Sequence, residues 1–310
     1  MKTIKDVKAI IYFEDEKDNA IVRNVLNQQT AEIYSYQNEA NLSDILKELQ
    51  IRDYNSKEVL ILKPFLGRLF QKCPGSQHMI CCNYLLINTC FGCLYNCTYC
   101  FLHSYLNSFG IVQFTNIKEV LPEIESHVKD DNFIYRIGTG EYTDSLMFDE
   151  VTGIAEEIIN FTSSMKNVMV EFKTKSNNID HLLHIKNKGN TVLAWSLNTQ
   201  RNIDEYETDT ASLDERLNAA IKASDTGYYL AFHFDPIIIY EGFINEYMEL
   251  LDLLFTKINN DRIVWISLGG FRYSYGFKHT VQDLFPQEKL TTAELFPGAD
   301  GKYRYLKHMR

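Results

Sequence analysis

Three cysteines on one short segment are the residues of this sequence whose types and spacing point most directly to a chemistry. They are Cys93, Cys97 and Cys100, in the run Cys93-Leu-Tyr-Asn-Cys97-Thr-Tyr-Cys100. The C-x3-C-x2-C spacing suits three irons of a [4Fe–4S] cluster and leaves the fourth iron without a cysteine ligand. Because an open iron can bind a cofactor, the segment predicts a cluster that works together with a second small molecule.

The remaining cysteines leave two alternatives open. All seven cysteines lie between positions 73 and 100, whereas a disulfide framework would spread them over a small secreted chain. The alternatives are buried free cysteines and a structural zinc site built from Cys90-x2-Cys93 and Cys97-x2-Cys100. Only three residues separate these pairs, compared with roughly 12–20 in a zinc ribbon. The spacing therefore favours the cluster, and the role of Cys90 stays open.

The composition indicates a globular enzyme. The 310 residues are 45% hydrophobic and 23% charged, with six prolines and fifteen glycines. The first residues lack the apolar stretch of a signal peptide, and no run reaches the length of a membrane span. Thiols clustered in this way stay reduced in the cytoplasm, so the cysteine content agrees with a cytoplasmic location. We therefore expect a cytoplasmic protein with no membrane partner.

The net charge of −10 argues against sequence-independent binding of a polyanion, because affinity for phosphates comes from lysine and arginine. A nucleic-acid role would need a local basic groove. The candidate residues are scattered along the chain: Lys72, Lys173, Lys175, Arg201, Arg272, Lys278, Lys302, Arg304, Lys307 and Arg310.

From Leu85 onward, short apolar runs alternate with longer amphipathic stretches, which is typical of βα units with a parallel sheet. The predicted strands are Leu85–Thr89, Phe133–Gly138, Val168–Thr174, Thr191–Leu197, Tyr228–Phe234 and Arg262–Leu268. Two of the intervening helices are clear: one is capped by Ser212 with Glu215 three residues on, and one covers Phe243–Ile258.

The pattern predicts an α/β fold in which residues 85–310 form a partial (β/α)6 barrel with a C-terminal extension. Residues 1–84 are expected to form a small N-terminal α/β appendage, with strands at Val7–Phe13, Ala31–Tyr36 and Val59–Lys63, a helix at Asp15–Gln28 and a turn at Cys73-Pro-Gly-Ser. In such barrels the carboxyl ends of the strands carry the chemistry. The polar motifs obey this rule, since each lies at or directly after the carboxyl end of a predicted strand: the cysteine segment, Gly138–Asp144, Lys173–Lys175, Ser196 with Asn198, His233–Pro236 and Ser267–Arg272.

With these motifs in view, the chain from about Lys63 to its C-terminus resembles the spore photoproduct lyase family of radical S-adenosylmethionine (SAM) enzymes. The resemblance is carried by Cys73-Pro-Gly, Ile80-Cys-Cys-Asn-Tyr84, Asn88 to Leu102, Arg136-Ile-Gly-Thr-Gly-Glu-Tyr-Thr-Asp144, Lys173-Thr-Lys175, Trp195-Ser-Leu-Asn198, Phe232-His-Phe-Asp-Pro-Ile237 and Trp265-Ile-Ser-Leu-Gly269. It implies a radical SAM barrel that holds a [4Fe–4S] cluster and SAM.

The resemblance also implies an activity. Family members cleave SAM reductively to a 5′-deoxyadenosyl radical, which abstracts hydrogen from a thymine photolesion in DNA and leads to its repair. DNA with a pyrimidine photolesion and an electron donor such as flavodoxin or ferredoxin would be the partners.

Roles for individual residues follow from the same resemblance. It implies iron ligation by Cys93, Cys97 and Cys100, a place beside the cofactor for Tyr99, and SAM contacts from Lys175, Ser196 and Asn198. Gly138, Gly140 and Glu141 would hold the methionine end of SAM, with Thr143 and Asp144 nearby. For the two glycines a tight βα turn is an equal alternative, and Lys175 and Ser196 could instead be surface residues at the barrel rim.

Two departures from the family pattern bear on the substrate. Repair enzymes of the family carry a cysteine after the second strand and a tyrosine after the last cluster cysteine. This chain has no cysteine after Cys100 and has Phe101 at the second position, a side chain without a hydroxyl hydrogen. A substitute hydrogen donor would be Tyr142 or one of the thiols Cys73, Cys81 and Cys82, although buried structural cysteines are the alternative for the last two.

Three functions therefore stay open. The first is a radical SAM lyase acting on a pyrimidine lesion. The second keeps the radical chemistry with a peptide, an RNA base or a metabolite as substrate, which the acidic charge and both departures favour. The third is a non-catalytic metal-binding module.

Overall fold

The computed structural model of the chain describes residues 1–27, 31–75, 78, 80, 83–106 and 108–306. The strands within these residues are β1 (Ala9–Phe13), β2 (Glu32–Tyr36), β3 (Val59–Lys63), β4 (Phe70–Lys72), β5 (Leu85–Ile87), β6 (Cys90–Phe91), β7 (Asn96–Cys97), β8 (Ile111–Phe114), β9 (Tyr135–Gly138), β10 (Val168–Thr174), β11 (Thr191–Ser196), β12 (Glu207–Thr208), β13 (Tyr229–Ile237), β14 (Ile263–Gly270), β15 (Arg272–Tyr273), β16 (Phe296–Pro297) and β17 (Tyr303–Arg304).

The helices in the same part of the chain are α1 (Ala20–Asn27), α2 (Glu39–Ile51), α3 (Leu102–Tyr105), α4 (Leu121–His127), α5 (Asp149–Thr152), α6 (Ile154–Thr162), α7 (Gln200–Tyr206), α8 (Leu213–Asp225), α9 (Phe243–Lys257) and α10 (Phe277–Leu284). A short 3-10 helix, η3 (Ser56–Glu58), precedes β3. None of the helices in the described ranges is long and apolar enough to cross a membrane.

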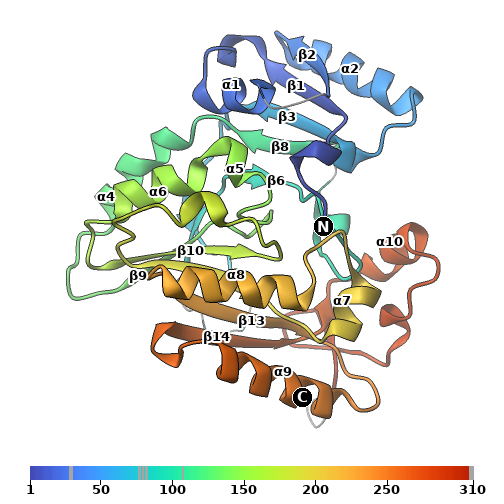
Figure 1. Cartoon of the computed structure of the whole chain (residues 1–310). Helices are drawn as coiled ribbons and strands as arrows, with labels where there is room; N and C mark the ends of the chain where they lie inside the picture. The colour runs from blue at the N-terminus through green and yellow to red at the C-terminus, as the bar shows by residue number, and fades with distance from the viewer. Residues whose placement is uncertain (28–30, 76–77, 79, 81–82, 107, 307–310) are drawn as a thin grey trace.

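The larger sheet has seven strands in the order β14-β13-β11-β10-β9-β5-β4. Six of them are parallel, and β4 pairs antiparallel with β5. The six parallel strands are the six predicted from the sequence, so the parallel βα arrangement is confirmed. Figure 1 shows this sheet in the lower part of the molecule, with α8 and α9 packed beside its strands.

The alternation of side chains along β10 explains how this sheet builds both a core and a site. Val168, Val170 and Phe172 are buried in the main hydrophobic core together with apolar residues of α6, α8 and α9. Successive side chains of a strand point to opposite faces. Glu171 and Lys173 therefore point to the other face, toward the interior of the open barrel.

The boundaries of the predicted strands shift for local reasons. β9 begins at Tyr135 rather than Phe133, because the N–H of Phe133 donates to the carbonyl of Asp130 in a turn and pairing with β10 starts at Tyr135. β13 continues to Ile237 although Pro236 lacks a backbone donor, and a register shift against β14 accommodates the interruption. The predicted cap of α8 is confirmed, since the hydroxyl of Ser212 accepts from the backbone N–H of Glu215 and the Glu215 carboxylate accepts in return.

A smaller, five-stranded sheet has the order β2-β1-β3-β8-β6 and lies at the other end of the molecule (Figure 1). Its strands β1, β2 and β3 agree with the three strands predicted in residues 1–84. The predicted helix at 15–28 is shorter, because the Asn19 side chain accepts from the N–H of Ile21 and α1 begins only at Ala20. The proposed division at residue 84 falls before β8 and β6, which belong to this same sheet.

Candidate functional site

The cysteine loop, residues 93–100, is tied to the loop that follows β11. Asn96 and Cys97 form β7, which pairs antiparallel with β12. The backbone N–H of Thr98 donates to the carbonyl of Tyr206, 2.8 Å away, and that of Cys100 donates to Cys97 at 3.0 Å. These bonds fix the backbone between the second and third cysteine.

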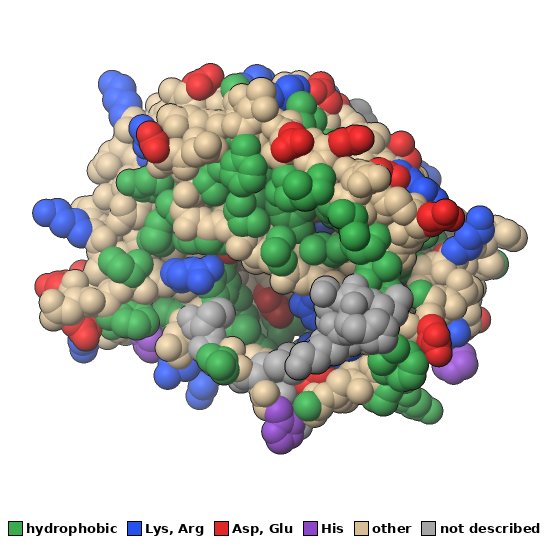
Figure 2. All heavy atoms as spheres, turned by 90° about the horizontal axis from the view of Figure 1, so that it is seen from below, with side chains coloured by type: hydrophobic (Ala, Val, Ile, Leu, Met, Phe, Trp, Pro, Cys, Tyr) green, Lys and Arg blue, Asp and Glu red, His purple; other side chains and the backbone are tan. Residues whose placement is uncertain are grey.

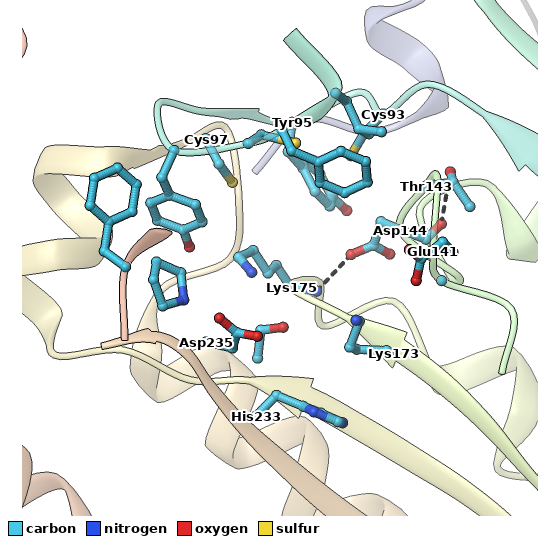
Figure 3. Close-up of a pocket in the computed structure, with 18 of the residues that line it drawn as sticks. Cys93, Tyr95, Cys97, Glu141, Thr143, Asp144, Lys173, Lys175, His233 and Asp235 are labelled. Carbon is cyan, nitrogen blue, oxygen red and sulfur yellow. Dashed lines mark hydrogen bonds between the residues drawn. The ribbon is translucent and has the colours of Figure 1, made fainter. Parts of the chain in front are cut away.

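The three cysteines line one cavity of about 400 Å³ at the carboxyl ends of the barrel strands. Figure 3 shows Cys93 and Cys97 on one side of it and Lys175, Asp235 and His233 on the other. Seven further residues predicted for the site also line this cavity: Tyr99, Gly140, Glu141, Thr143, Asp144, Lys175 and Ser196. The structure therefore brings together segments that are more than a hundred residues apart in the sequence.

The electrostatic surroundings of the thiols fit ligation of a positively charged centre. Burial raises the pKa of Cys93 to about 12 and raises the pKa values of Cys97 and Cys100 as well. The charges of Lys57 and Lys175 and the backbone N–H groups of the loop act in the opposite direction. Because metal ligation requires thiolates, a cationic iron–sulfur core would supply the compensation that buried thiolates need.

The described residues contain no group of three or more His, Cys, Asp and Glu side chains arranged around a single metal ion. In a cuboidal cluster each thiolate binds a different iron. The three sulfurs of Cys93, Cys97 and Cys100 are therefore not required to meet at one point.

A buried ion pair lies next to the cysteine loop and holds the side chain of Tyr99. The Tyr99 hydroxyl donates to the carboxylate of Glu207, which pairs with the Arg216 guanidinium at 2.7 Å. Both side chains of the pair are almost completely buried. Burial alone would raise the pKa of Glu207, but the charge of Arg216 holds it below its ordinary value. Tyr99 is thus fixed by its hydroxyl, with the ammonium of Lys175 5.6 Å from the centre of its ring.

The loop after β9 is held by Asp144. One carboxylate oxygen accepts from the Thr174 hydroxyl at 2.7 Å and the other from the backbone N–H of Lys175 at 2.6 Å. A side chain at Gly140 would place its Cβ 2.9 Å from the Ser145 hydroxyl oxygen. Asp144 and Gly140 therefore let this loop pack closely against the end of β10 and turn Glu141 toward the cavity.

Gly138 does not line the cavity within the described part of the chain. A Cβ there would lie 2.0 Å from the hydroxyl oxygen of Tyr84. The Tyr84 hydroxyl donates to Glu171, whose carboxylate also pairs with His233 at 2.6 Å. The requirement for glycine at this position thus comes from an aromatic neighbour, a third explanation beside the turn and the cofactor contact considered from the sequence.

Ser196 and Asn198, both predicted to contact SAM, lie in different places. Ser196 lines the cavity, and its backbone carbonyl accepts from Arg216 at 2.9 Å. Asn198 is buried outside the described lining. Its side-chain oxygen accepts from the Tyr247 hydroxyl at 2.6 Å, and its amide donates to the carbonyl of Pro236 at 3.2 Å. Through these contacts Asn198 links the end of β11 to β13 and to α9.

Tyr142 lies in a cluster of aromatic rings rather than in the described lining. Its ring stacks on Tyr105, with the centroids 5.4 Å apart, and lies 6.4 Å from Phe101, which does line the cavity. Burial, with a further contribution from the Tyr105 hydroxyl, raises the pKa of Tyr142. Cys73 is half-buried. The predictions for Cys81 and Cys82 fall outside the described residues.

Sequence reasoning missed three residues around the site. Lys57 is bonded to the cysteine loop, and Glu207 with Arg216 supports it. The only local signal was Arg216, a charged residue on the buried face of a predicted helix, which requires a partner. Lys57 and Glu207 carry no such signal, because their contacts depend on chain segments far away in the sequence.

This chain is similar in sequence to curated spore photoproduct lyases. The spore photoproduct lyase of Bacillus subtilis (strain 168) is 28% identical over 207 residues, which are 66% of this chain and 60% of the relative. That of Clostridium acetobutylicum is 26% identical over 223 residues, which are 71% and 64% of the two chains. The chain thus spans about three fifths of the length of these curated relatives.

Solved structures of spore photoproduct lyase variants share the fold. One of them, with bound AdoMet and dinucleoside spore photoproduct, has a TM-score of 0.81 at 22% identity, covering 97% of this chain and 91% of that one. Another has a TM-score of 0.82 with the same coverage. The family model described as spore photoproduct lyase matches residues 19–309. This chain therefore belongs to the spore photoproduct lyase family.

Proposed function

We propose that this protein is a radical SAM enzyme in which Cys93, Cys97 and Cys100 bind a [4Fe–4S] cluster and the open iron takes SAM. The observation that carries the proposal is that the three thiols share one cavity with most of the residues predicted for SAM, although not with Gly138 or Asn198. Membership of the spore photoproduct lyase family supports it. A non-catalytic metal module would not need the cavity of about 400 Å³ beside the thiols.

Different residues around the cavity would bind different groups of SAM. Both carboxylate oxygens of Asp144 already accept bonds from the chain, so Asp144 shapes the loop, and Glu141 is the carboxylate offered to the ammonium of SAM. Lys175 and the hydroxyl of Ser196 face the same space and would bind its carboxylate and ribose. Tyr99 would form a wall beside the cofactor. Asn198 would act as a positioning residue.

When bound, the cluster and SAM would supply one-electron reductive cleavage of SAM and, with it, a radical able to abstract hydrogen from the substrate. The protein contributes binding and orientation. Because buried side chains line much of the site, bound reactants would be held away from bulk water. An external one-electron donor such as flavodoxin or ferredoxin completes the proposed reaction.

The first proposed substrate is a thymine photolesion in DNA, and the reaction is carbon–carbon bond cleavage of the lesion. Some of the solved structures contain dinucleoside spore photoproduct, and this chain has their fold. Arg272 and Lys302, which line the cavity, would bind a backbone phosphate of the DNA. Arg272 is already paired with Asp235 at 2.9 Å, so a phosphate would have to share it.

A second candidate keeps the radical chemistry and changes the substrate to a peptide, an RNA base or a metabolite. Phe101 lines the cavity and has no hydroxyl hydrogen to give. On the face shown in Figure 2, lysines and arginines are interspersed with acidic side chains around a hollow, without a continuous basic stripe among the described residues. The first observation argues against repair by the family's hydrogen donors, and the second argues against binding of long DNA.

Hydrogen return to the product requires a donor, and we propose Tyr142 for this role. Its hydroxyl is near that of Tyr105, and its ring packs against Phe101 at the edge of the cavity. Cys73 is the alternative donor among the described cysteines. Tyr142→Phe should lower product formation without changing SAM cleavage in the absence of substrate, and unchanged turnover in Tyr142→Phe would move the role to Cys73.

The test of the proposed function is anaerobic reconstitution followed by dithionite and SAM. 5′-Deoxyadenosine should form, and dinucleoside spore photoproduct should increase its rate and yield repaired thymines. 5′-Deoxyadenosine that does not respond to the dinucleoside would support the second candidate. Absence of 5′-deoxyadenosine from protein that carries a complete cluster would contradict both.

A further inference from the structure

Lys57 reaches from η3, next to the smaller sheet, to the backbone of the cysteine loop. Its ammonium donates to the carbonyl of Cys93 at 2.8 Å and also to the carbonyl of Tyr95. These two carbonyls lie 36 and 38 residues further along the chain. One side chain of the N-terminal segment thus fastens the part of the loop that holds the first cysteine.

The backbone of Lys57 is itself firmly placed. Its N–H donates to the Asn55 side chain at 2.9 Å, while the Glu58 carboxylate accepts from the N–H of Asn55 at 3.0 Å, which completes a capping box. Glu58 is in turn paired with Lys8 at 2.6 Å. The backbone that carries the ammonium is therefore already fixed, so binding of the carbonyls costs only the conformational entropy of the lysine side chain.

The charge of Lys57 lies beside the backbone of the first cysteine of the loop. No carboxylate in the described part of the chain forms a hydrogen bond or ion pair with its ammonium, which bonds only the two neutral carbonyls. A partly buried positive charge without a counter-ion stabilises negative charge nearby more strongly than an exposed, paired one would.

Lys57 lies on the side of the loop away from the predicted SAM residues. It lines a second cavity of about 340 Å³ together with Cys93, Cys100 and His103. The two cavities share Cys93 and Cys100, so the cysteine loop forms a wall of both. On this side His103 bonds the carbonyl of Cys97 at 2.9 Å, and Lys57 is the group here that carries a fixed charge.

We propose that Lys57 is a positioning residue for the cysteine loop, and that its charge raises the reduction potential of the cluster bound there. Adding an electron makes the cluster more negative, and a nearby ammonium favours that state. Net charge around a cluster is one of the factors that set its potential. The second half of this inference rests on the proposed function, whereas the fastening of the loop does not.

The experiment compares Lys57→Met and Lys57→Arg with Lys63→Met. The control removes an equal charge from β3 of the same sheet, where Lys63 pairs with Glu39 at 3.2 Å and does not touch the loop. Should Lys57→Met fail to fold, as judged by circular dichroism, Lys57→Gln removes the charge while keeping an amide donor. Two readouts are used, hydrogen exchange of metal-free protein over residues 93–98 and a potentiometric titration of the reconstituted cluster followed by electron paramagnetic resonance.

In Lys57→Met, amide exchange over residues 93–98 should become about ten-fold faster, because loop opening loses its restraint. At a fixed potential the ratio of reduced to oxidised cluster should fall about ten-fold, which corresponds to a shift of about 59 mV for one electron. Lys57→Arg and Lys63→Met should match the wild type in both readouts.

Unchanged exchange in Lys57→Met would overturn the fastening role, and an unchanged potential would overturn the electrostatic role. If the wild-type protein takes up no cluster, the proposed function fails. The exchange measurement on metal-free protein still decides the fastening role in that case.

Discussion

Replacing Arg216 by methionine should destabilise the protein severely, because it leaves the buried carboxylate of Glu207 without the guanidinium that pairs with it. Arg216 is fully buried and pairs with Glu207 at 2.7 Å. It also donates to the carbonyls of Ala211 and Ser196, both at 2.9 Å, and to the Thr210 hydroxyl at 2.7 Å. Methionine has a similar length and no donor, so all four acceptors lose their partner.

The magnitude follows from comparison with an exposed pair. Removing one partner of a buried ion pair costs about 3–5 kcal/mol, and the orphaned carbonyls place Arg216→Met toward the upper end. Lys222 and Asp180 form a pair at 3.0 Å with side chains more than half exposed, and Lys222→Met should cost less than about 1 kcal/mol. Since a domain is stable by only about 5–15 kcal/mol, the first change removes a large share of the total.

The assay is urea unfolding at neutral pH of both variants and of the double variant Arg216→Met/Glu207→Gln. The double variant no longer buries an isolated charge, so it should regain about 2 kcal/mol relative to Arg216→Met. A cost below about 1 kcal/mol for Arg216→Met, or a double variant no more stable than the single one, would refute the reasoning.

Three further predictions follow from the same structure. The pKa of Glu207 is held below 4.5 despite burial, so the contribution of Glu207 to stability is complete above pH 4.5 and is lost as the pH falls toward the folded-state pKa. In Glu207→Gln, the curve of urea midpoint against pH should therefore be flatter over this acidic range. A curve parallel to that of the wild type would contradict this prediction. Gly138→Ala would put a Cβ 2.0 Å from the Tyr84 hydroxyl oxygen and should cost about 1–3 kcal/mol in urea unfolding, whereas Gly270→Ala, whose Cβ meets only an atom 3.8 Å away, should not; equal costs would show that the close approach does not matter. Lys175→Met should weaken SAM binding about ten-fold in calorimetric titration with unchanged stability, and an unchanged affinity would place Lys175 outside the SAM site.

The sequence was sufficient where the decisive interactions are local. The short apolar run at Val168–Thr174 predicted a strand with the same bounds as β10, and the Ser212 and Glu215 pair located the start of α8. The motifs at strand ends could be predicted to lie together, because parallel strands present their carboxyl ends at one edge of the sheet. This is why Cys93 and Lys175 share a cavity.

The sequence was insufficient where one residue depends on a distant one. Gly138 is read as a turn or a ligand contact from the sequence, but its neighbour Tyr84 comes from a segment before the barrel. Asn198 ends a strand like a ligand-binding residue, yet Tyr247 on α9 and the Pro236 carbonyl occupy its side chain. Lys57 lies in a polar turn with no local sign of its contact to the cysteine loop.

The most direct test of the central claim measures the iron that anaerobically reconstituted protein retains and the response of its reduced-cluster resonance to SAM. We expect about four irons per chain, a resonance that changes when SAM is added, and loss of both in Cys93→Ala, Cys97→Ala and Cys100→Ala. Cys90 is buried and lies outside the described lining of the main cavity, so Cys90→Ala should keep the iron and the response. Iron retained by the three loop variants, or a single bound zinc in place of iron, would contradict the account.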